Sequence, residues 1–149
     1  FLPPMVARKR GHVVNVSSAA GYFAAGLLGA YCTTKFGVFG LSEALREELG
    51  PHGIGVSTIC PGLIDTPIIG ATRRRGKMAA PERQARVAEL YKKRGFGPEK
   101  VGSAILDAVA RKRTVVPVTP EAWFLYAAKR VAPGLLARIS SMISAKTTG

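Results

Sequence analysis

Three short runs of β-branched and apolar residues limit what this chain can fold into. They are HVVNVSS (12–18), IGVSTICPG (54–62) and TVVPV (114–118), and each is typical of a buried strand. Segments with helical spacing of apolar residues separate them, so strands and helices alternate. This alternation predicts an α/β fold in which βαβ units build a parallel sheet. Pro117 indicates that the third run lies at a sheet edge or a strand end.

The segments between the strands are expected to be helical. Apolar residues recur at steps of three and four between residues 30 and 50, namely at Val38, Leu41, Leu45 and Leu49. Three further helices are predicted. One covers residues 81–94, a second begins at Pro98, and a third begins after Thr119 and is interrupted at Pro133-Gly134. The opening residues FLPPMVARKRG are typical of a helix end. The glycine-rich stretch 19–29 is expected to be a loop.

The chain is strongly basic, with a net charge of +13 over 149 residues. The basic residues gather in ARKR (7–10), RRRGK (73–77), KKR (92–94) and RKR (111–113). Such charge attracts nucleic acid, anionic membranes or phosphorylated ligands, but helix ends and loops also often carry solvated Lys and Arg. No aromatic-interleaved or helix-turn-helix pattern accompanies the charge, so we expect no specific nucleic-acid binding.

Cysteine and histidine patterns exclude several other classes of site. Cys32 and Cys60 show neither metal-ligand spacing nor a disulfide framework, so we expect no metal site and two reduced, buried thiols in a cytoplasmic protein. His12 and His52 lie at element boundaries, and without a G-x-S-x-G motif they do not indicate a serine hydrolase. No apolar run reaches the ~18 residues that a membrane-spanning helix needs.

Tyr31 and Lys35 form the core of a candidate catalytic site. Residues four apart on a helix share a face. A free tyrosine titrates near pH 10, too high for a base at neutral pH, and a neighbouring ammonium favours the phenolate. Ser18 lies just past a strand end, where its hydroxyl can bind the same substrate oxygen. These three residues can move a proton, but a hydride must come from a cofactor.

The segment SSAAGYFAAGLLGAYCTTK (17–35) resembles the Ser…Tyr-x-x-x-Lys active-site segment of the short-chain dehydrogenase/reductase family. The gap from Ser18 to Tyr31 is the family's usual spacing. NVSS (15–18) is similar to the strand before the active site, and ICPGLIDTP (59–67) to the later Pro-Gly…Thr segment. The resemblance covers residues 3 to 118. It implies the C-terminal part of a doubly wound, parallel Rossmann-type sheet with helices on both faces.

The resemblance also implies a role for each matching residue. Tyr31 would be the general acid/base, Lys35 would assist it and bind the nicotinamide ribose, and Ser18 would hold the substrate oxygen. The remaining cofactor contacts would come from Pro61, Gly62, the backbone of Ile64 and the hydroxyl of Thr66. Residues 67–95 would form the substrate lid, with 1–118 as the Rossmann-type part and 119–149 as a C-terminal amphipathic helical extension with a polar tail.

One expected element is missing. Members of the family bind the phosphates of their cofactor at a glycine-rich turn after the first strand. The glycine-rich stretch of this chain, GYFAAGLLG, lacks the G-x-G-x-x-G spacing of that turn. Since the sequence also starts without Met, we expect it to be the C-terminal part of a longer protein and to be inactive alone. The cofactor would be NADP(H) or NAD(H), with a slight preference for NADP(H), because the residues that discriminate them belong to the missing part.

The C-terminal stretch carries an apolar stripe beside basic residues. The stripe comprises Trp123, Phe124, Leu125, Tyr126, Leu135, Leu136, Ile139, Met142 and Ile143. It predicts peripheral membrane contact or packing against the domain or a second subunit. With the apolar lid residues Ile68, Ile69, Met78 and Leu90, it also fits a lipophilic substrate.

Two functions follow from these patterns. The first is an NAD(P)-dependent oxidoreductase, expected to be a homo-oligomer, that interconverts a lipophilic secondary alcohol and a carbonyl. The alternative is a non-catalytic module that binds a membrane surface or a partner through its basic face and C-terminal helix.

Overall fold

A single parallel sheet organises the chain. The computed structural model describes residues 1–24, 26, 28–67 and 81–148. The strands β1 (Gly11–Val16), β2 (Ile54–Cys60) and β3 (Val115–Pro117) lie in the order β1-β2-β3, and both pairings are parallel. The helices are α1 (Leu2–Ala7), α2 (Gly29–Leu49), α4 (Pro81–Arg94), α5 (Pro98–Ala110), α6 (Pro120–Val131) and α7 (Pro133–Thr148), with 3-10 turns η1 (Ala19–Gly21) and η2 (Gly50–His52). The predicted α/β fold class is confirmed.

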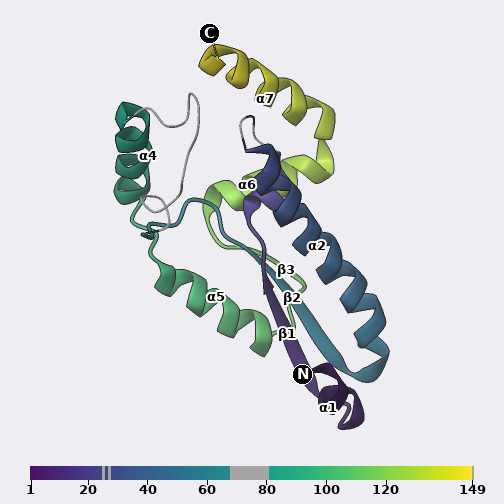
Figure 1. Ribbon diagram of the computed structural model, residues 1–149. Helices are drawn as coiled ribbons and strands as arrows, with labels where there is room; N and C mark the ends of the chain where they lie inside the picture. Colours follow the sequence, from purple (N-terminus) through teal and green to yellow (C-terminus); the bar gives the residue numbers. More distant parts are fainter. Residues whose placement is uncertain (25, 27, 68–80, 149) are drawn as a thin grey trace.

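Strand β2 is the central strand of the sheet, and its side chains show which helices pack on each face. Its Ile54 and Val56 pack with Leu49 and the other apolar residues of α1 and α2, whereas Ile59 packs with Ala108 of α5. Because successive side chains of a strand point to opposite faces, α2 and α5 cover opposite faces of the sheet, as Figure 1 shows. The predicted βαβ units with helices on both faces are therefore present.

The turns that lead into β1 and β3 share one sequence and one backbone conformation. Residues 7–10 and 110–113 both read ARKR. Each turn ends a helix with a pair of overlapping hydrogen bonds, from Lys9 N to Val6 O and Arg10 N to Met5 O in the first turn, and from Lys112 N to Val109 O and Arg113 N to Ala108 O in the second. This is the Schellman arrangement, which favours glycine at its left-handed position.

Lysine occupies that left-handed position in both turns. The φ angle is 52° at Lys9 and 51° at Lys112, the two non-glycine residues with positive φ in the described part of the chain. Since parallel strands begin at the same edge of a sheet, both turns lie at its amino end.

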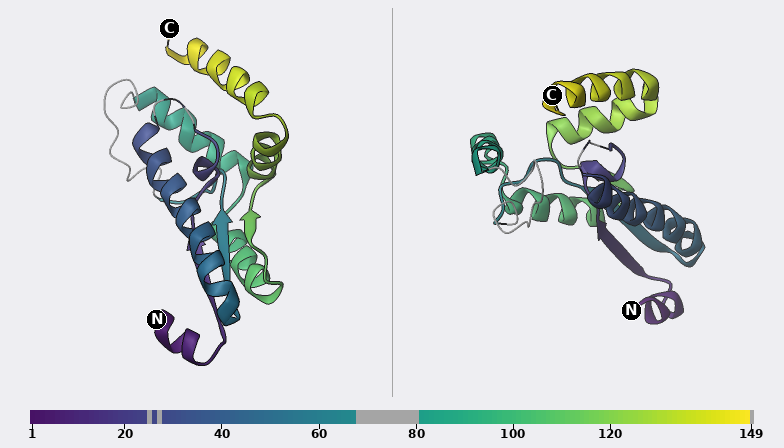
Figure 2. Two further views of the ribbon diagram at one scale, coloured as in Figure 1. Left: turned by 90° about the vertical axis from the view of Figure 1, so that its right-hand side faces the viewer. Right: turned by 45° about the horizontal axis from the view of Figure 1, so that its top comes forward.

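Helices α6 and α7 lie at the opposite, carboxyl end of the sheet (Figures 1 and 2). Ala122 of α6 is fully buried, and Tyr22 donates a hydrogen bond of 2.7 Å to its carbonyl oxygen. The predicted break is present, because α6 ends at Val131 and α7 begins at Pro133. Thr119 is the N-cap of α6, as its place before the predicted helix indicated, but its buried hydroxyl makes no side-chain capping bond.

The apolar stripe predicted for this region is divided between core and solvent. Leu136 is buried, whereas Phe124, Leu135 and Met142 are exposed. None of the described helices is long and apolar enough to span a membrane.

Candidate active site

The first part of the candidate site is the turn that follows β1. Ser17 is buried, and its hydroxyl donates to the carbonyl oxygen of Lys35 in α2 at 2.8 Å. Gly21 allows this close approach, because a Cβ there would stand 2.9 Å from the same carbonyl and would also meet the Ser17 hydroxyl. The small residues of the Ser-Ser-Ala-Ala-Gly stretch therefore let the end of β1 pack directly against α2. The stretch predicted as a loop contains the 3-10 turn η1.

Tyr31 and Lys35 lie on one face of α2, beside the end of β1. The Lys35 ammonium donates a hydrogen bond of 3.2 Å to the carbonyl oxygen of Val16, the last residue of β1. It also stands 5.8 Å from the centre of the Tyr31 ring. Tyr31 is 45% exposed, so its phenol remains open to a ligand. The arrangement places a cation and an accessible phenol together at the carboxyl end of the sheet.

Ser18 connects β1 to the loop after β2. Its hydroxyl donates to the carbonyl oxygen of Pro61 at 3.3 Å and accepts from the amide of Ala20 at 3.2 Å, as the N-cap of η1. The amide of Ala19 also donates to Pro61 O, at 2.8 Å. Ser18 is half-buried, and its oxygen retains capacity to accept a further hydrogen bond.

Cys60, at the end of β2, lies behind these residues and is fully buried. Burial raises the pKa of the Cys60 thiol to about 12, against the smaller opposing effects of the Ser18 backbone amide and the Lys35 ammonium. The thiol is therefore protonated at neutral pH and is a poor nucleophile. Cys32 is also free and buried, as predicted.

The loop after β2 is held by the start of α6. The amide of Leu63 donates to the Glu121 carboxylate at 2.9 Å, and the amide of Asp65 donates to Phe96 O at 2.8 Å. At Gly62 a Cβ would collide with the hydroxyl of Thr119 and would stand 2.6 Å from the Glu121 carboxylate. Pro61 and Gly62 thus form a fixed wall beside the end of β1.

The predicted cofactor residues share this end of the sheet. Ile64 is buried and Thr66 is half-buried, both within the loop that Glu121 anchors. No residue of the described part accepts a hydrogen bond from the Ile64 amide. The Ile64 amide and the Lys35 ammonium are hydrogen-bond donors of the kind that a nicotinamide carboxamide and a ribose hydroxyl accept. The residues present therefore fit the nicotinamide end of a dinucleotide.

The predicted lid is only partly described. Residues 68–80, with Ile68, Ile69 and Met78, lie outside the described residues. The remainder includes α4, whose Leu90 is 46% exposed. In the part of the chain that the structure describes, no group of three or more His, Cys, Asp and Glu residues could hold a metal ion.

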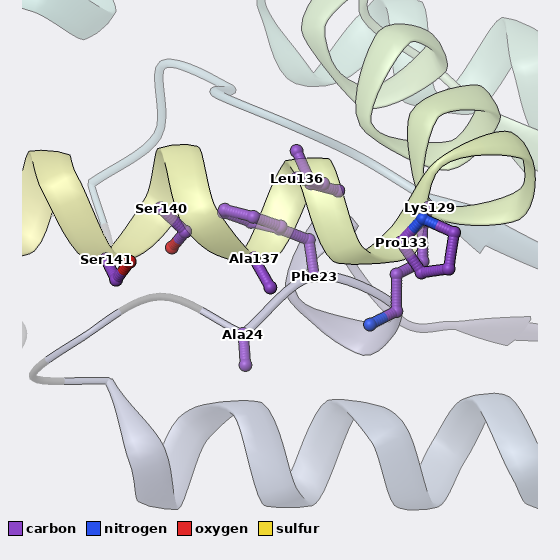
Figure 3. Close-up of a pocket in the computed structure, with 8 residues that line it drawn as sticks. All are labelled: Phe23, Ala24, Lys129, Pro133, Leu136, Ala137, Ser140 and Ser141. Atoms are coloured by element: carbon purple, nitrogen blue, oxygen red, sulfur yellow. The ribbon is translucent and has the colours of Figure 1, made fainter.

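A cavity of about 430 Å³ opens between the loop after η1 and helices α6 and α7 (Figure 3). Its lining is Phe23, Ala24, Lys129, Pro133, Leu136, Ala137, Ser140 and Ser141. Neither Ser18, Tyr31 nor Lys35 is among these residues, so the cavity adjoins the candidate site without containing it. Phe23 and Leu136 give it apolar walls, and Lys129 places an ammonium at its edge.

Three residues of this end were not identified from the sequence. Glu121 holds the loop after Pro61 through the Leu63 amide, Thr119 packs against Gly62, and Tyr22 connects η1 to α6. Burial raises the pKa of the Tyr22 phenol, with further contributions from Cys60, Tyr126 and Glu121, so Tyr22 stays protonated as a structural donor. The only available signal was the Thr-Pro-Glu helix start, which indicates a cap but not a contact with a loop 58 residues away.

Comparisons with known proteins agree with this geometry. Residues 1–77 match the family model "short chain dehydrogenase". The protein named "Probable oxidoreductase EphD" of Mycobacterium tuberculosis is 42% identical over 130 residues, which cover 85% of this chain and 22% of that protein.

Solved structures give the same result. A short-chain dehydrogenase from Streptomyces avermitilis has a TM-score of 0.71 and 26% identity, and the match covers 99% of this chain and 56% of that one. A second, from Burkholderia phymatum in complex with NAD, has a TM-score of 0.68 and 23% identity over 91% and 52% of the two chains, and shows the shared fold. This chain therefore spans between about a fifth and somewhat more than half of the proteins it matches.

Proposed function

The chain belongs to the short-chain dehydrogenase family, and from this premise we propose that the whole protein is an NAD(P)-dependent oxidoreductase that interconverts a secondary alcohol and a carbonyl. One observation carries the proposal. The Lys35 ammonium is fixed on Val16 O beside the exposed phenol of Tyr31, at the carboxyl end of a parallel sheet. Ligands of open α/β sheets bind outside this end of the strands.

Each residue has a distinct task in the proposed reaction. The bound nicotinamide supplies or accepts the hydride. Tyr31 exchanges a proton with the substrate oxygen through its phenol, and the positive charge of Lys35 stabilises the phenolate that forms when the proton leaves. Ser18 donates a hydrogen bond to the same oxygen, after releasing its bond to Pro61 O. Pro61 and Gly62 keep the opposite wall in place, while Ile64 N and the Thr66 hydroxyl hold the carboxamide.

Only one end of the cofactor site lies in this chain. The described residues offer donors for the nicotinamide and its ribose, and no glycine-rich turn for the pyrophosphate is present in the sequence. We therefore propose that the phosphates are bound by a part of the protein outside this chain, and that the chain alone is inactive. The slight preference for NADP(H) over NAD(H) stays a prediction.

A lipophilic substrate fits the surroundings of the site. The adjacent cavity has apolar walls at Phe23 and Leu136, and Leu90 of α4 exposes an apolar side chain. Exposed Phe36 and Leu41 on α2 support a homo-oligomer, because such residues are usually covered in an assembled protein. The free thiols of Cys32 and Cys60 support a reducing compartment such as the cytoplasm.

The first test is Tyr31→Phe in the full-length protein. Loss of the phenolic proton should lower kcat/KM for a carbonyl substrate by about 10²- to 10⁴-fold, the usual contribution of a positioned acid/base, while nicotinamide binding persists. Tyr126→Phe is the matched control, because it also removes one hydroxyl from a tyrosine near the core but outside the site. Turnover that survives in Tyr31→Phe would show that another group moves the proton.

A further inference from the structure

The two ARKR turns carry more positive charge than their structural task requires. A Schellman turn is satisfied by glycine at its left-handed position, yet Lys9 and Lys112 both occupy that position with φ near +50°. Lysine is strained there, whereas glycine is not. Unfavourable backbone conformations that persist often mark functional positions.

Little negative charge compensates these turns. Asp107 pairs with Arg111 at 2.6 Å and with Arg113 at 3.2 Å. Within the described residues no salt bridge reaches the four other basic side chains, which are those of Arg8, Lys9, Arg10 and Lys112. All four belong to exposed residues. They form one positive surface, here called the basic edge: residues 8–10 and 111–113.

The basic edge is continuous because β2 joins its two turns. Lys9 O lies 2.8 Å from where a Cβ of Gly53 would stand, and the Ser57 hydroxyl donates to Arg113 O while meeting His12 Nε2 at 2.7 Å. Gly11 pairs with Ile54 and Val115 with Thr58, so the turn at Lys112 lies about three residues further along β2 than the turn at Lys9. The two turns are offset by roughly 10 Å along the strands and roughly 10 Å across the sheet, a separation of about 14 Å. The offset along the strands, which sets how far each turn lies from a surface across the amino end, is about one Debye length at ~0.1 M salt. Both turns therefore feel the field of one flat anionic surface.

Neighbouring apolar side chains favour a membrane over nucleic acid. Leu106 is 73% exposed and Val109 is 39% exposed on α5, within two turns of residues 111–113. Apolar side chains beside a basic cluster suit a bilayer interface with anionic headgroups. The basic edge contains no aromatic residue for base stacking, and it consists of turns rather than a helix that could enter a groove.

The C-terminal helices cannot share that contact. The sequence predicted that the basic face and the C-terminal stretch together meet a membrane. In the structure α6 and α7 follow the carboxyl end of the sheet, whereas the basic edge precedes β1 and β3 at its amino end (Figure 1). A flat bilayer meets one end or the other. The described residues of α6 and α7 also combine basic and exposed apolar side chains, but the amino end gathers six basic residues into two short turns, and two of them, Lys9 and Lys112, have positive φ.

We propose that the basic edge docks the protein on anionic lipid surfaces, with the candidate active site turned away from the bilayer.

The test uses the full-length protein and vesicles of phosphatidylcholine with and without phosphatidylserine. The double variant Lys9→Gly/Lys112→Gly removes two charges and also removes the backbone strain, so it should fold at least as well. It should lower the partition coefficient on serine-containing vesicles about 25-fold. The control variant Lys92→Gln/Lys93→Gln in α4 loses the same amount of charge and should change this partition coefficient less than twofold.

Two further variants complete the design. Lys9→Arg/Lys112→Arg should retain binding, and Phe124→Gln/Val131→Gln in α6 should leave it unchanged. An equal loss in the Lys92/Lys93 control would mean that only net charge matters, and a loss confined to the α6 variant would move the contact to the C-terminal helices. Equal binding to neutral vesicles, or no vesicle binding together with tight duplex DNA binding lost in the Gly variant, would also overturn the proposal.

Discussion

The two ends of the sheet are built in opposite ways. At the amino end, each helix-to-strand turn is closed by hydrogen bonds within six residues, and two copies of one tetrapeptide have the same conformation. At the carboxyl end, the turn after β1, the loop after β2 and the start of α6 hold one another across long sequence separations. The amino end is therefore specified locally, whereas the candidate site exists only when distant segments meet.

Gly62→Ala should have the largest effect on stability, because it separates those segments. The added Cβ would collide with the Thr119 hydroxyl and the Glu121 carboxylate. Overpacking of this kind lowers the free energy of unfolding by about 1–3 kcal/mol, which urea denaturation of the full-length protein would measure. The matched control is Gly102→Ala in α5, where no atom lies within 4 Å of the new Cβ. Equal stability changes in both variants would mean that the close approach at Gly62 is unimportant.

Lys112→Gly should act in the opposite direction at the amino end. Glycine adopts φ near +50° without strain, so the variant should raise the free energy of unfolding by about 1 kcal/mol. Lys112→Ala separates charge from conformation, because alanine removes the ammonium but is strained like lysine. A stabilisation by alanine as large as that by glycine would show that charge repulsion, not backbone strain, is relieved.

The smallest expected effect is a pH dependence from His12. Burial, and secondarily the charge of Lys112, lower the pKa of His12 from its usual 6.5. The unfolded chain therefore binds a proton more readily than the folded chain, so stability falls as pH drops below about 6.5. Urea midpoints between pH 7.5 and 5.5 should show this fall, and His12→Gln should reduce it. An unchanged pH profile in His12→Gln would assign the dependence to other groups.

The sequence allowed the elements to be placed because their signals are local. A continuous run of β-branched and apolar residues located β2, and apolar residues at steps of three and four located α2. Pro81 and Pro98 marked the starts of α4 and α5, and Pro133 marked the break between α6 and α7. The facing of Tyr31 and Lys35 followed from helix geometry alone.

The contacts that hold the candidate site together could not be predicted from local sequence patterns, because they join segments far apart in the sequence. Nothing in the spacing of Gly62 and Glu121 indicates that they approach, because that approach depends on the parallel register of β2 and β3. Likewise, the sequence distinguishes Tyr31 by its spacing to Lys35 but gives Tyr22 no role, and only the structure shows that the Tyr22 phenol is buried and bonded to Ala122.

The hydrogen bond from Tyr22 to Ala122 also bears on the order of events during synthesis. Its partners are 100 residues apart, and a ribosome adds about 5–20 residues per second, so Tyr22 waits roughly 5–20 s for its acceptor to be made. Helical turns such as those at Lys9 and Lys112 close within about a microsecond of leaving the ribosome. The two ARKR turns can thus close as soon as each has been made, whereas the contact between η1 and α6 must wait until Ala122 has been synthesised.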